Sequence, residues 1–522
     1  MCGIAGVFDF NNRSIDDKKV EIMLNQIRHR GQDSSNVSYG NEISKFSNIV
    51  LGHRRLAIID LKQESKQPMC YDDRYYITYN GEIYNYIEMK QELVKKGYKF
   101  KTDSDTEVIL ASYDEWGENC LNKFRGMFAF VIWDKNKEEL FCARDQFGIK
   151  PFYYHLSDNE FVFASESTAI NKIISTELDD VSIYMYLLSM YIPGERSAFK
   201  GIKKLLPAHY MKIKGTSVEV KRYWQINEFE VEDEITIKEQ KIFQSEIEQV
   251  VKRQLRSDVK VGAFLSGGLD SGLIVSIAAK EIPNLNTFSL GYEGLDRNEL
   301  PFAKRISDRY GTTHHELYLK ENDVLPYLDE AINCLCEPIA DSAIIANYAL
   351  SKMASDCGVK VLLNGTGGDE IFGGYSRYTI SSCSRYLIEN YNMILNKLFK
   401  KVAKKNYLRN RICNIEFDEL CSTGGSYKAV NNFFNRNYMP ELLDEIKIRN
   451  DSEIENRTYK RMIFDQEYYL PDELLLLLDQ TTMAWTIEGR VPFLDIDIAE
   501  KAFRYSSNNH TNVSETKRFL RK

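Results

Sequence analysis

The second residue of the chain is a cysteine that could act as a nucleophile. Because the Cys2 side chain is small, the initiator Met1 can be removed, which leaves Cys2 at the amino end. Its own α-amino group, with an ordinary pKa near about 8, could then take the proton from its thiol. The residues that follow, GIAGV, are typical of a β-strand, so the thiol would lie at a strand end. The alternative is a small apolar residue with no chemical role.

The segment VKVGAFLSGGLDSG, at residues 259–272, predicts a strand, a glycine turn and a helix. This order of elements presents backbone N–H groups to a phosphate. Gly267 and Gly268 lack Cβ atoms, which lets the backbone curl closely around an anion. Asp270 would repel a bare phosphate, so we expect a divalent cation such as Mg²⁺ between them. The alternative is an ordinary corner between a strand and a helix.

A second glycine-rich loop lies in VKVLLNGTGGDEIFGGY, at residues 359–375, and it also follows a predicted strand. Strands and helices alternate through this half of the chain, which predicts a parallel sheet with its ligand site at the carboxyl ends of the strands. Asp270 and Asp369 could therefore clamp one or two Mg²⁺ ions against a bound phosphate. The alternative for Asp369 and Glu370 is a helix N-cap followed by an acid in the first turn.

The composition is that of a globular protein with at least two domains, since the chain has 522 residues and is 43% hydrophobic. The net charge of -8, with both signs intermixed, gives no support for nucleic-acid binding. The sequence has no apolar run of about 18 residues and no signal-peptide pattern, so we expect no membrane segment. The ten cysteines are scattered, which favours reduced thiols in the cytoplasm.

Seven short motifs in the first half resemble the glutaminase domain of class II glutamine amidotransferases. They are MCGIAG, RHRGQD, HRRLAIID, YNGEIYN, SDTEV, RDQFGIKPFYY and FASE. The resemblance implies an αββα sandwich of the N-terminal-nucleophile type, in which Cys2 attacks the side-chain amide of glutamine and forms a thioester. Asn80 and Gly81 would stabilise the oxyanion. The implied glutamine site consists of Arg55, Leu56, Ala57, Ile58, Ile59, Asn80, Gly81, Glu82 and Asp105.

Within that implied site, each polar side chain has a part of glutamine to bind. Arg55 would pair with the α-carboxylate, as suits its planar, bidentate group of donors. Glu82 and Asp105 would bind the α-ammonium group. The backbone of residues 56–59 would line the pocket.

The second half resembles the synthetase domain of glutamine-dependent asparagine synthetases. The motifs that carry the resemblance are FLSGGLDSG, TFSLGYE, NELPFA, GTTHHE, EPIADSA, GGDEIFGGYSRY and MAWTIEGRVPFLD. It implies a parallel-sheet domain of the ATP-pyrophosphatase type with an added helical region, which spans about residues 381–500. The implied ATP site consists of Leu265, Ser266, Gly267, Gly268, Leu269, Asp270, Ser271, Leu290, Asn364 and Gly365. Such domains make β-aspartyl-AMP, which ammonia from the glutaminase site then attacks.

We therefore predict a glutaminase domain at residues 1–212, a linker at residues 213–235 and a synthetase domain at residues 236–522. The expected reaction consumes glutamine, ATP and aspartate and gives asparagine, glutamate, AMP and pyrophosphate. A homodimer is common among the proteins that this chain resembles.

Three departures from the family pattern leave alternatives open. Thr366 stands where an acid is usual, and Gln480 stands where a basic residue is usual. We also expect the chain to lack the family's lysine-bearing segment beyond residues 517–522, for which Lys522 is a poor substitute. One alternative is an amidotransferase for another carboxylate, such as a sugar acid in surface-polymer biosynthesis. Another is a truncated copy with glutaminase activity only.

Overall fold

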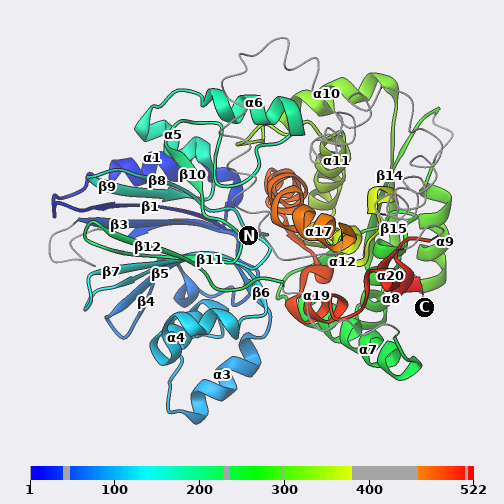
Figure 1. Cartoon of the computed structure of the whole chain (residues 1–522), viewed down its shortest axis with the longest axis horizontal. Helices are drawn as coiled ribbons and strands as arrows, with labels where there is room; N and C mark the ends of the chain where they lie inside the picture. Colours follow the sequence, from blue (N-terminus) through cyan, green and yellow to red (C-terminus); the bar gives the residue numbers. More distant parts are fainter. Residues whose placement is uncertain are drawn as a thin grey trace, which may run out of the picture.

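The computed structural model describes residues 2–38, 48–226, 235–294, 298–378, 457–511 and 515–521. Two units lie side by side (Figure 1). The first unit is a sandwich of β-sheets between helices, and the second is a sheet surrounded by helices. This arrangement confirms the predicted α/β fold with two kinds of sheet.

The first unit contains two antiparallel sheets, each of six strands in the described residues. One sheet has the order β10-β8-β9-β1-β3-β2, and the other has the order β12-β11-β7-β6-β5-β4. The strands are β1 Gly3–Asp9, β2 Ser34–Ser38, β3 Ile49–Arg55, β4 Met69–Tyr71, β5 Tyr75–Ile83, β6 Gly126–Asp134, β7 Glu139–Arg144, β8 Tyr153–Leu156, β9 Glu160–Ala164, β10 Ile202–Lys204, β11 His209–Lys214 and β12 Ser217–Arg222.

Every residue of β1 is buried, because β1 lies between β3 and β9 within its sheet and between a helix layer and the second sheet. Close packing leaves no room for a side chain at Gly6, where a Cβ atom would come within 2.5 Å of the Phe163 ring. Large apolar side chains such as Phe8, Trp133 and Phe163 fill the space between the sheets. The mainly apolar sequence of β1 follows from this burial on both faces.

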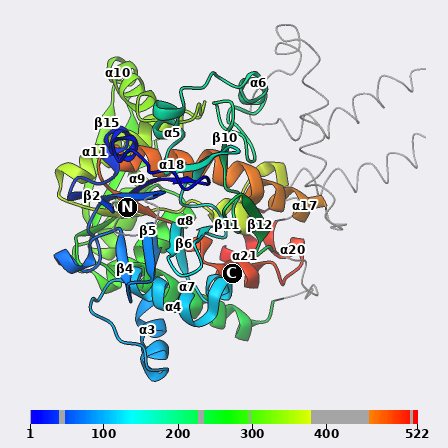
Figure 2. The same cartoon turned by 90° about the vertical axis from the view of Figure 1, so that its left-hand side faces the viewer.

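Helices cover the two outer faces of the sandwich (Figure 1). Figure 2 shows the same layers after a quarter turn, with the first unit toward the viewer. The helices of this unit are α1 Lys18–Gln26, η1 Arg28–Arg30, η2 Gln63–Ser65, α3 Tyr86–Lys95, α4 Asp105–Trp116, η3 Gly117–Asn122, α5 Ser167–Ile174 and α6 Asp180–Ser189.

The strand β12 extends the second sheet to Arg222 by pairing with β11 along its whole length. The sequence predicts a linker from residue 213, but β12 belongs to the sandwich. Its residues are mostly exposed, so the strand lacks the apolar alternation by which strands are predicted. Pairing with β11 therefore decides its structure.

The second unit contains a sheet with the order β15-β14-β13-β16-β17, in which every pair is parallel. The parallel sheet is thus confirmed. Its strands are β13 Val261–Phe264, β14 Asn286–Tyr292, β15 Thr313–Leu319, β16 Val361–Leu363 and β17 Glu488–Arg490. The helices are α7 Ile237–Gln254, α8 Leu269–Glu281, α9 Leu300–Tyr310, α10 Glu321–Ile332, α11 Ala343–Asp356, α12 Gly368–Phe372, α17 Arg457–Phe464, η5 Asp465–Leu474, α18 Leu475–Met483, η6 Pro492–Leu494, α19 Ile496–Ala502, α20 Ser507–His510 and α21 Arg518–Arg521.

Part of the predicted helical region, residues 379–456, lies outside the described residues. The described remainder is helical from Arg457 to Met483, where α17, η5 and α18 follow one another directly. Within this mainly helical stretch, Glu488–Arg490 forms the strand β17 and pairs with β16. Three residues are too few to show a period, so only the neighbouring strand determines this element.

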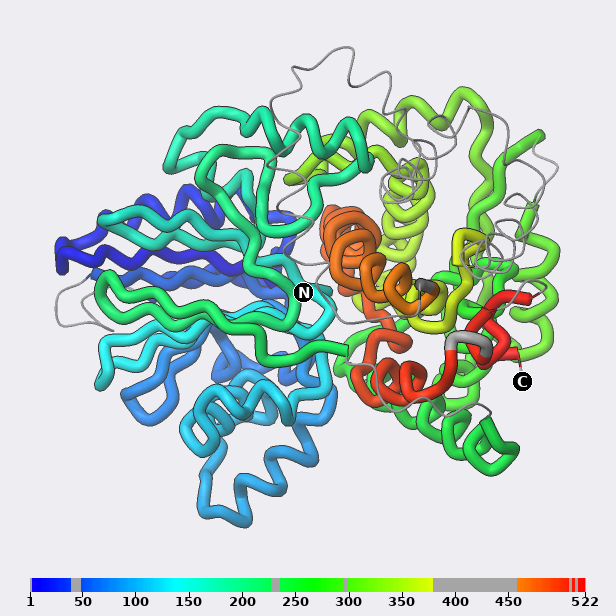
Figure 3. The backbone as a smooth tube through the Cα atoms, viewed as in Figure 1, coloured from blue at the N-terminus to red at the C-terminus, as the bar shows by residue number. Residues whose placement is uncertain are grey.

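The two units share one apolar core, which includes Leu56 and Phe147 of the first unit and Val250 and Val491 of the second. Figure 3 shows the chain leaving the sandwich after β12 and entering α7, and it shows the carboxyl-terminal segment returning close to α12. No helix in the described parts of the chain is long and apolar enough to cross a bilayer. The shared core brings sequence segments of both units to the same sites.

Candidate active sites

Cys2 lies where the first strand of the sandwich begins, and it is 9% exposed. Its backbone nitrogen donates a hydrogen bond to Oδ1 of Asn80 at 3.0 Å, and its Sγ lies 3.8 Å from the carbonyl oxygen of Leu56. Burial raises the pKa of the Cys2 thiol. The thiol therefore needs a nearby base to become a nucleophile, which agrees with the predicted use of its own α-amino group.

Asn80 and Gly81 lie on β5, across the sandwich from the start of β1. Oδ1 of Asn80 accepts from Cys2, whereas its buried Nδ2 has no hydrogen-bond partner among the described residues. A Cβ atom on Gly81 would lie 2.1 Å from the carbonyl oxygen of Met127, so only glycine fits here. The structure brings together the thiol and an unused amide donor, as an oxyanion site requires.

The side chains predicted to bind the α-carboxylate and α-ammonium groups of glutamine belong to the same site. Arg55 is buried and donates to the carbonyl oxygens of Lys62 and Asp60 at 3.0 and 2.6 Å. Asp105 accepts from the Tyr79 hydroxyl at 2.8 Å and from the Ile83 amide at 3.0 Å. These contacts hold both charged groups in place.

Burial raises the pKa of both predicted ammonium ligands, Glu82 and Asp105, and their mutual repulsion raises that of Glu82 further. Oε1 of Glu82 is buried without a partner among the described residues. A cationic ligand between these two carboxyl groups would offset their repulsion. The site is therefore electrostatically suited to the α-ammonium group of an amino acid.

The segment of residues 56–59, predicted to line the glutamine pocket, also contacts the second unit. The carbonyl oxygen of Ile58 accepts from the Asp258 amide at 2.9 Å. The amide of Ala57 donates to Asp33 at 2.8 Å, and Lys360 pairs with the same carboxylate at 3.2 Å. The wall of the first site is thus held by residues next to β13 and β16.

Sequence reasoning missed the residues of the second unit that reach the first site. Arg490 on β17 is fully buried, and its guanidinium lies 3.4 Å from Glu82 and 2.7 Å from Glu488. Arg30 of the first unit contacts Cys2 directly, and one of its other partners is Asp479 on α18. The motif RHRGQD contains Arg30, and the motif IEGRVPFLD contains Arg490. Nothing in the spacing of the two motifs indicates that these residues reach the same site.

The second unit has a cavity of about 610 Å³ at the carboxyl ends of its strands. The structure brings most of the predicted ATP ligands to this cavity. Its lining includes Leu265, Ser266, Asp270, Ser271, Leu290, Asn364 and Gly365. Gly267, Gly268 and Leu269 form the turn between them, where the Gly268 amide donates to Oγ of Ser266 at 3.1 Å.

The two glycine-rich loops pack against each other at this cavity. A Cβ atom on Gly368 would lie 2.7 Å from the Asp270 carboxylate, and one on Gly365 would lie 3.1 Å from the Asp270 Cβ. Glycine at both positions allows the second loop to approach Asp270. Asp270 and Asp369 therefore converge, as the sequence predicts.

A lysine that sequence reasoning did not select lies between these two carboxylates. Nζ of Lys517 pairs with Oδ2 of Asp270 and, at 2.8 Å, with Oδ1 of Asp369. Although burial disfavours its charge, the two carboxylates raise the pKa of Lys517. The ammonium group of Lys517 therefore lies beside the predicted phosphate-binding turn and carries a positive charge there.

The two carboxylates fit the usual protein contribution to a Mg²⁺ site, in which substrate phosphates and water complete the shell. Oδ1 of Asp270 is buried without a hydrogen-bond partner in the described residues. Within the same residues, no group of three or more His, Cys, Asp and Glu side chains could hold a metal by itself. A cation here would thus depend on a bound phosphate.

Two of the three departures from the family pattern are side chains, and they lie in different places. Thr366 lines the cavity and donates to Oδ1 of Asn364 at 2.8 Å. Gln480 is buried on α18, where its Oε1 accepts from the Cys336 amide at 3.0 Å. Thr366 is therefore placed to contact a ligand, whereas Gln480 has a packing role.

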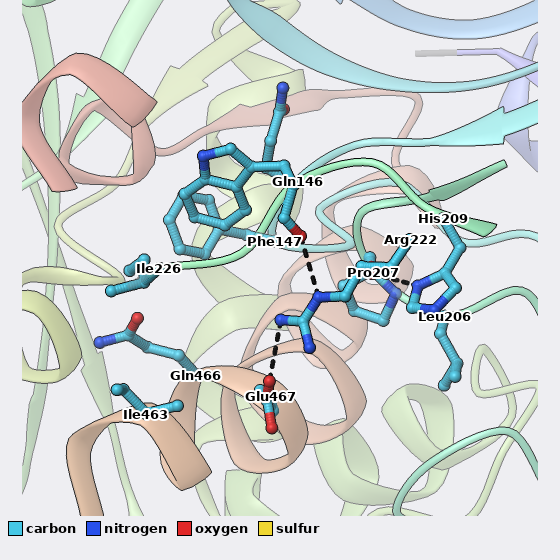
Figure 4. Close-up of a pocket in the computed structure, with 11 residues that line it drawn as sticks. Gln146, Phe147, Leu206, Pro207, His209, Arg222, Ile226, Ile463, Gln466 and Glu467 are labelled. Carbon is cyan, nitrogen blue, oxygen red and sulfur yellow. Dashed lines mark hydrogen bonds and ion pairs between the residues drawn. The ribbon is translucent and has the colours of Figure 1, made fainter. Parts of the chain in front are cut away.

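A smaller cavity of about 170 Å³ lies between the units and contains none of the predicted site residues among those that line it. Figure 4 shows Arg222 crossing it to Glu467, and the two side chains pair at 2.8 Å. Nε of Arg222 also donates to the carbonyl oxygen of Trp224 at 2.9 Å. The charged groups of this cavity are thus paired with each other.

Comparisons with known proteins agree with this division. A family model for a glutamine amidotransferase domain matches residues 1–224, and one for asparagine synthase matches residues 243–522. The chain belongs to the asparagine synthetase family. The amidotransferase match includes Cys2, and the asparagine synthase match includes the segment that contains Lys517.

Several asparagine synthetases are similar over most of the chain. The glutamine-hydrolyzing asparagine synthetase 1 of Bacillus subtilis is 34% identical over 100% of this chain and 84% of its own length. A putative asparagine synthetase 2 of Methanocaldococcus jannaschii is 38% identical over 72% of this chain and 76% of its own. Asparagine synthetase B of Escherichia coli is 30% identical over 72% of this chain and 65% of its own.

Proposed function

We propose that this protein converts aspartate, glutamine and ATP to asparagine, glutamate, AMP and pyrophosphate. The observation that carries the proposal is the presence of two sites in one chain. One holds a thiol beside an unused amide donor, and the other holds two carboxylates and a lysine beside two glycine loops. The names of the relatives, glutamine-hydrolyzing asparagine synthetases, support the same reaction.

In the first reaction, the α-amino group of Cys2 takes the thiol proton, and Sγ attacks the side-chain amide carbon of glutamine. Nδ2 of Asn80 and the amide of Gly81 donate to the oxygen that becomes negative. The proton then goes to the leaving nitrogen, ammonia departs, and water cleaves the thioester to give glutamate. Burial of the site protects the thioester until that water arrives.

Arg55, Glu82 and Asp105 orient the substrate for this attack. The Arg55 guanidinium would bind the α-carboxylate, and the two carboxyl groups would bind the α-ammonium. Because burial raises the pKa of Glu82 and Asp105, a bound ammonium would favour loss of their protons. The free energy of this charge pairing selects an amino acid over a simple amide.

In the second reaction, a carboxylate oxygen of aspartate attacks the α-phosphorus of ATP, and pyrophosphate leaves. Asp270 and Asp369 would hold Mg²⁺, which when bound neutralises charge on the pyrophosphate. The turn of residues 266–271 would donate backbone N–H groups to the pyrophosphate oxygens. Lys517 would add a positive charge at the same place.

Ammonia from the first site would then attack the acyl carbon, and AMP would leave. Leu56, Ile58 and Ile59 belong to the core that the units share. The strand β17 pairs with β16 of the second unit and brings Arg490 to Glu82 of the first site. Passage through such an interior would keep ammonia neutral and away from water. The free thiols of the described cysteines fit a cytoplasmic location, and a homodimer remains a prediction.

A second candidate function keeps this chemistry but changes the acceptor. Thr366 lines the cavity at the position where the family usually has an acid. A hydroxyl in place of a carboxylate would suit an acceptor with hydroxyl groups and no ammonium, such as a sugar acid. Measuring AMP release with glutamine while the acceptor acid is varied tests both functions. Release with aspartate supports the first function, and release only with another acid supports the second.

A further inference from the structure

Arg30 is a fully buried residue of η1 that contacts the nucleophile and the second unit at the same time. Its Nε donates to the carbonyl oxygen of Cys2 at 3.2 Å. Its two remaining nitrogens pair with Glu166 at 3.0 Å and with Asp479 at 2.7 Å. The planar guanidinium thus has three fixed acceptors, and its orientation follows theirs.

The acceptor in the second unit, Asp479, lies on α18 and is 2% exposed. Nζ of Lys150 lies 3.9 Å from the other carboxylate oxygen of Asp479. Glu166 also accepts from His29 at 2.8 Å, and His29 and Arg30 lower the pKa of Glu166 to about 2 despite its burial. Glu166 therefore keeps its negative charge beside Arg30 in the folded protein.

Arg30 contacts Cys2 at its carbonyl oxygen and not at the thiol or the backbone nitrogen, which are the atoms that react. Because the nitrogen is bonded to Asn80 and the carbonyl oxygen to Arg30, the backbone of Cys2 is held on both sides. The direction of Sγ depends on this backbone. A change in the orientation of Arg30 would consequently move the thiol relative to a bound amide.

We propose that Asp479 is a positioning residue that acts on Cys2 through Arg30. The glutaminase site is therefore complete only when the second unit is docked against the first. The inference rests on the proposed role of Cys2 as the nucleophile. Asp479 touches neither Cys2 nor the predicted glutamine ligands in the contacts of the described residues. It therefore sets the rate of attack rather than the affinity for glutamine.

The structure offers a matched control for a purely structural role. Asp472 on η5 also lies in the second unit, is 4% exposed and pairs across the interface with Lys204 at 2.8 Å. It accepts from the Gly194 amide at 2.7 Å. Asp472 and Asp479 are thus both buried, both paired with a cation of the first unit, and differ in whether that cation contacts Cys2.

The test measures glutamate release by the full-length protein with Asp479→Asn and with Asp472→Asn. For Asp479→Asn we expect kcat to fall about 10-fold with KM within about 2-fold, since small misplacements of reacting groups have effects of at least this size. For Asp472→Asn we expect the melting temperature to fall about as much as it does in Asp479→Asn. Its kcat should stay within about 2-fold of the native value. Native kcat in Asp479→Asn, or an equal loss in Asp472→Asn, overturns the inference.

A second variant covers the case in which Asp479→Asn does not fold. Asp479→Glu keeps the charge that Arg30 needs, but its extra methylene displaces the guanidinium, so kcat should fall about 3-fold or more with KM unchanged. An unchanged kcat overturns the inference here too. Cys2→Ala separates this result from the proposed function: glutamate release that survives Cys2→Ala contradicts the nucleophile itself, whatever Asp479 does.

Discussion

The two candidate sites manage charge in opposite ways. In the first unit, Asn80 and Glu82 are almost completely buried, and burial raises the pKa values of Cys2, Glu82 and Asp105. In the second unit, the Asp369 side chain is 35% exposed, and Lys517 lies between it and Asp270. The first site buries its thiol and carboxyl groups, which favours their neutral forms, whereas the second holds opposite charges at an open cavity.

The scaffold explains this difference. Antiparallel strands at the centre of a sandwich place side chains on rigid backbone between two sheets, which suits a reaction whose thioester intermediate is shielded from bulk water. Parallel strands end in loops at one edge, where glycine permits close approach to phosphates. The first kind of site suits a neutral amide, and the second suits a highly charged nucleotide.

The largest expected effect separates the two sites completely. Cys2→Ala removes the nucleophile, so glutamine-dependent turnover should fall at least about 1,000-fold, while ammonia-dependent synthesis is retained. Glutamate release and AMP release are measured in parallel. Cys120→Ala removes another buried thiol of the same unit and serves as the control, with turnover near the native value.

Removing the oxyanion donor should have the next largest effect. Asn80→Ala deletes the unpaired Nδ2, and we expect kcat for glutamine hydrolysis to fall about 100- to 1,000-fold. Asn85→Ala is the control, because Asn85 bonds only to backbone at Lys123 and Arg125 in the contacts described. A similar loss in both variants would show that the effect is structural.

The corresponding change in the second site tests whether its lysine acts on phosphate. Lys517→Ala should lower acceptor-dependent AMP formation about 100-fold and leave glutamate release intact, since Lys517 lies by the second cavity alone. Lys501→Ala, which breaks a pair with Glu246 elsewhere in the unit, is the control. AMP formation unaffected by Lys517→Ala contradicts the assigned role.

The smallest expected effect concerns stability. The second unit also has a buried carboxyl group whose pKa is raised, that of Glu473. Burial and the nearby Asp341 raise the pKa of Glu473 to about 8. Its contribution to stability is therefore complete below its ordinary pKa and is lost as the pH rises through about 8. Glu473→Gln should raise the melting temperature at least about 3 °C at pH 8 and much less at pH 5.

Thermal unfolding at the two pH values provides the check on Glu473. The control is Glu330→Gln, whose side chain is 51% exposed and which should leave the melting temperature unchanged at both. If the difference in melting temperature between Glu473→Gln and the native protein is the same at both pH values, burial does not raise the pKa of this carboxyl group.

Much of the fold could be predicted, because the strands and helices around the sites have strong local signals. The helix at Leu300–Tyr310 ends at Gly311, a local stop signal, since this glycine adopts a φ of 66° that residues with a side chain adopt less readily. The strands β12 and β17 could not be predicted. One is mostly exposed and the other has three residues, so each depends on the strand beside it.

By itself, the sequence determined the kind of chemistry: a cysteine next to Met1 and two glycine loops that each follow a strand and carry an aspartate. These signals are local, because each depends on a few consecutive residues. Only the tertiary structure decided that Arg30 meets Asp479, 449 positions further along the chain, and that Lys517 lies between Asp270 and Asp369. Ion pairs of this kind depend on how the two units and their loops pack, and packing leaves no periodic pattern in the sequence.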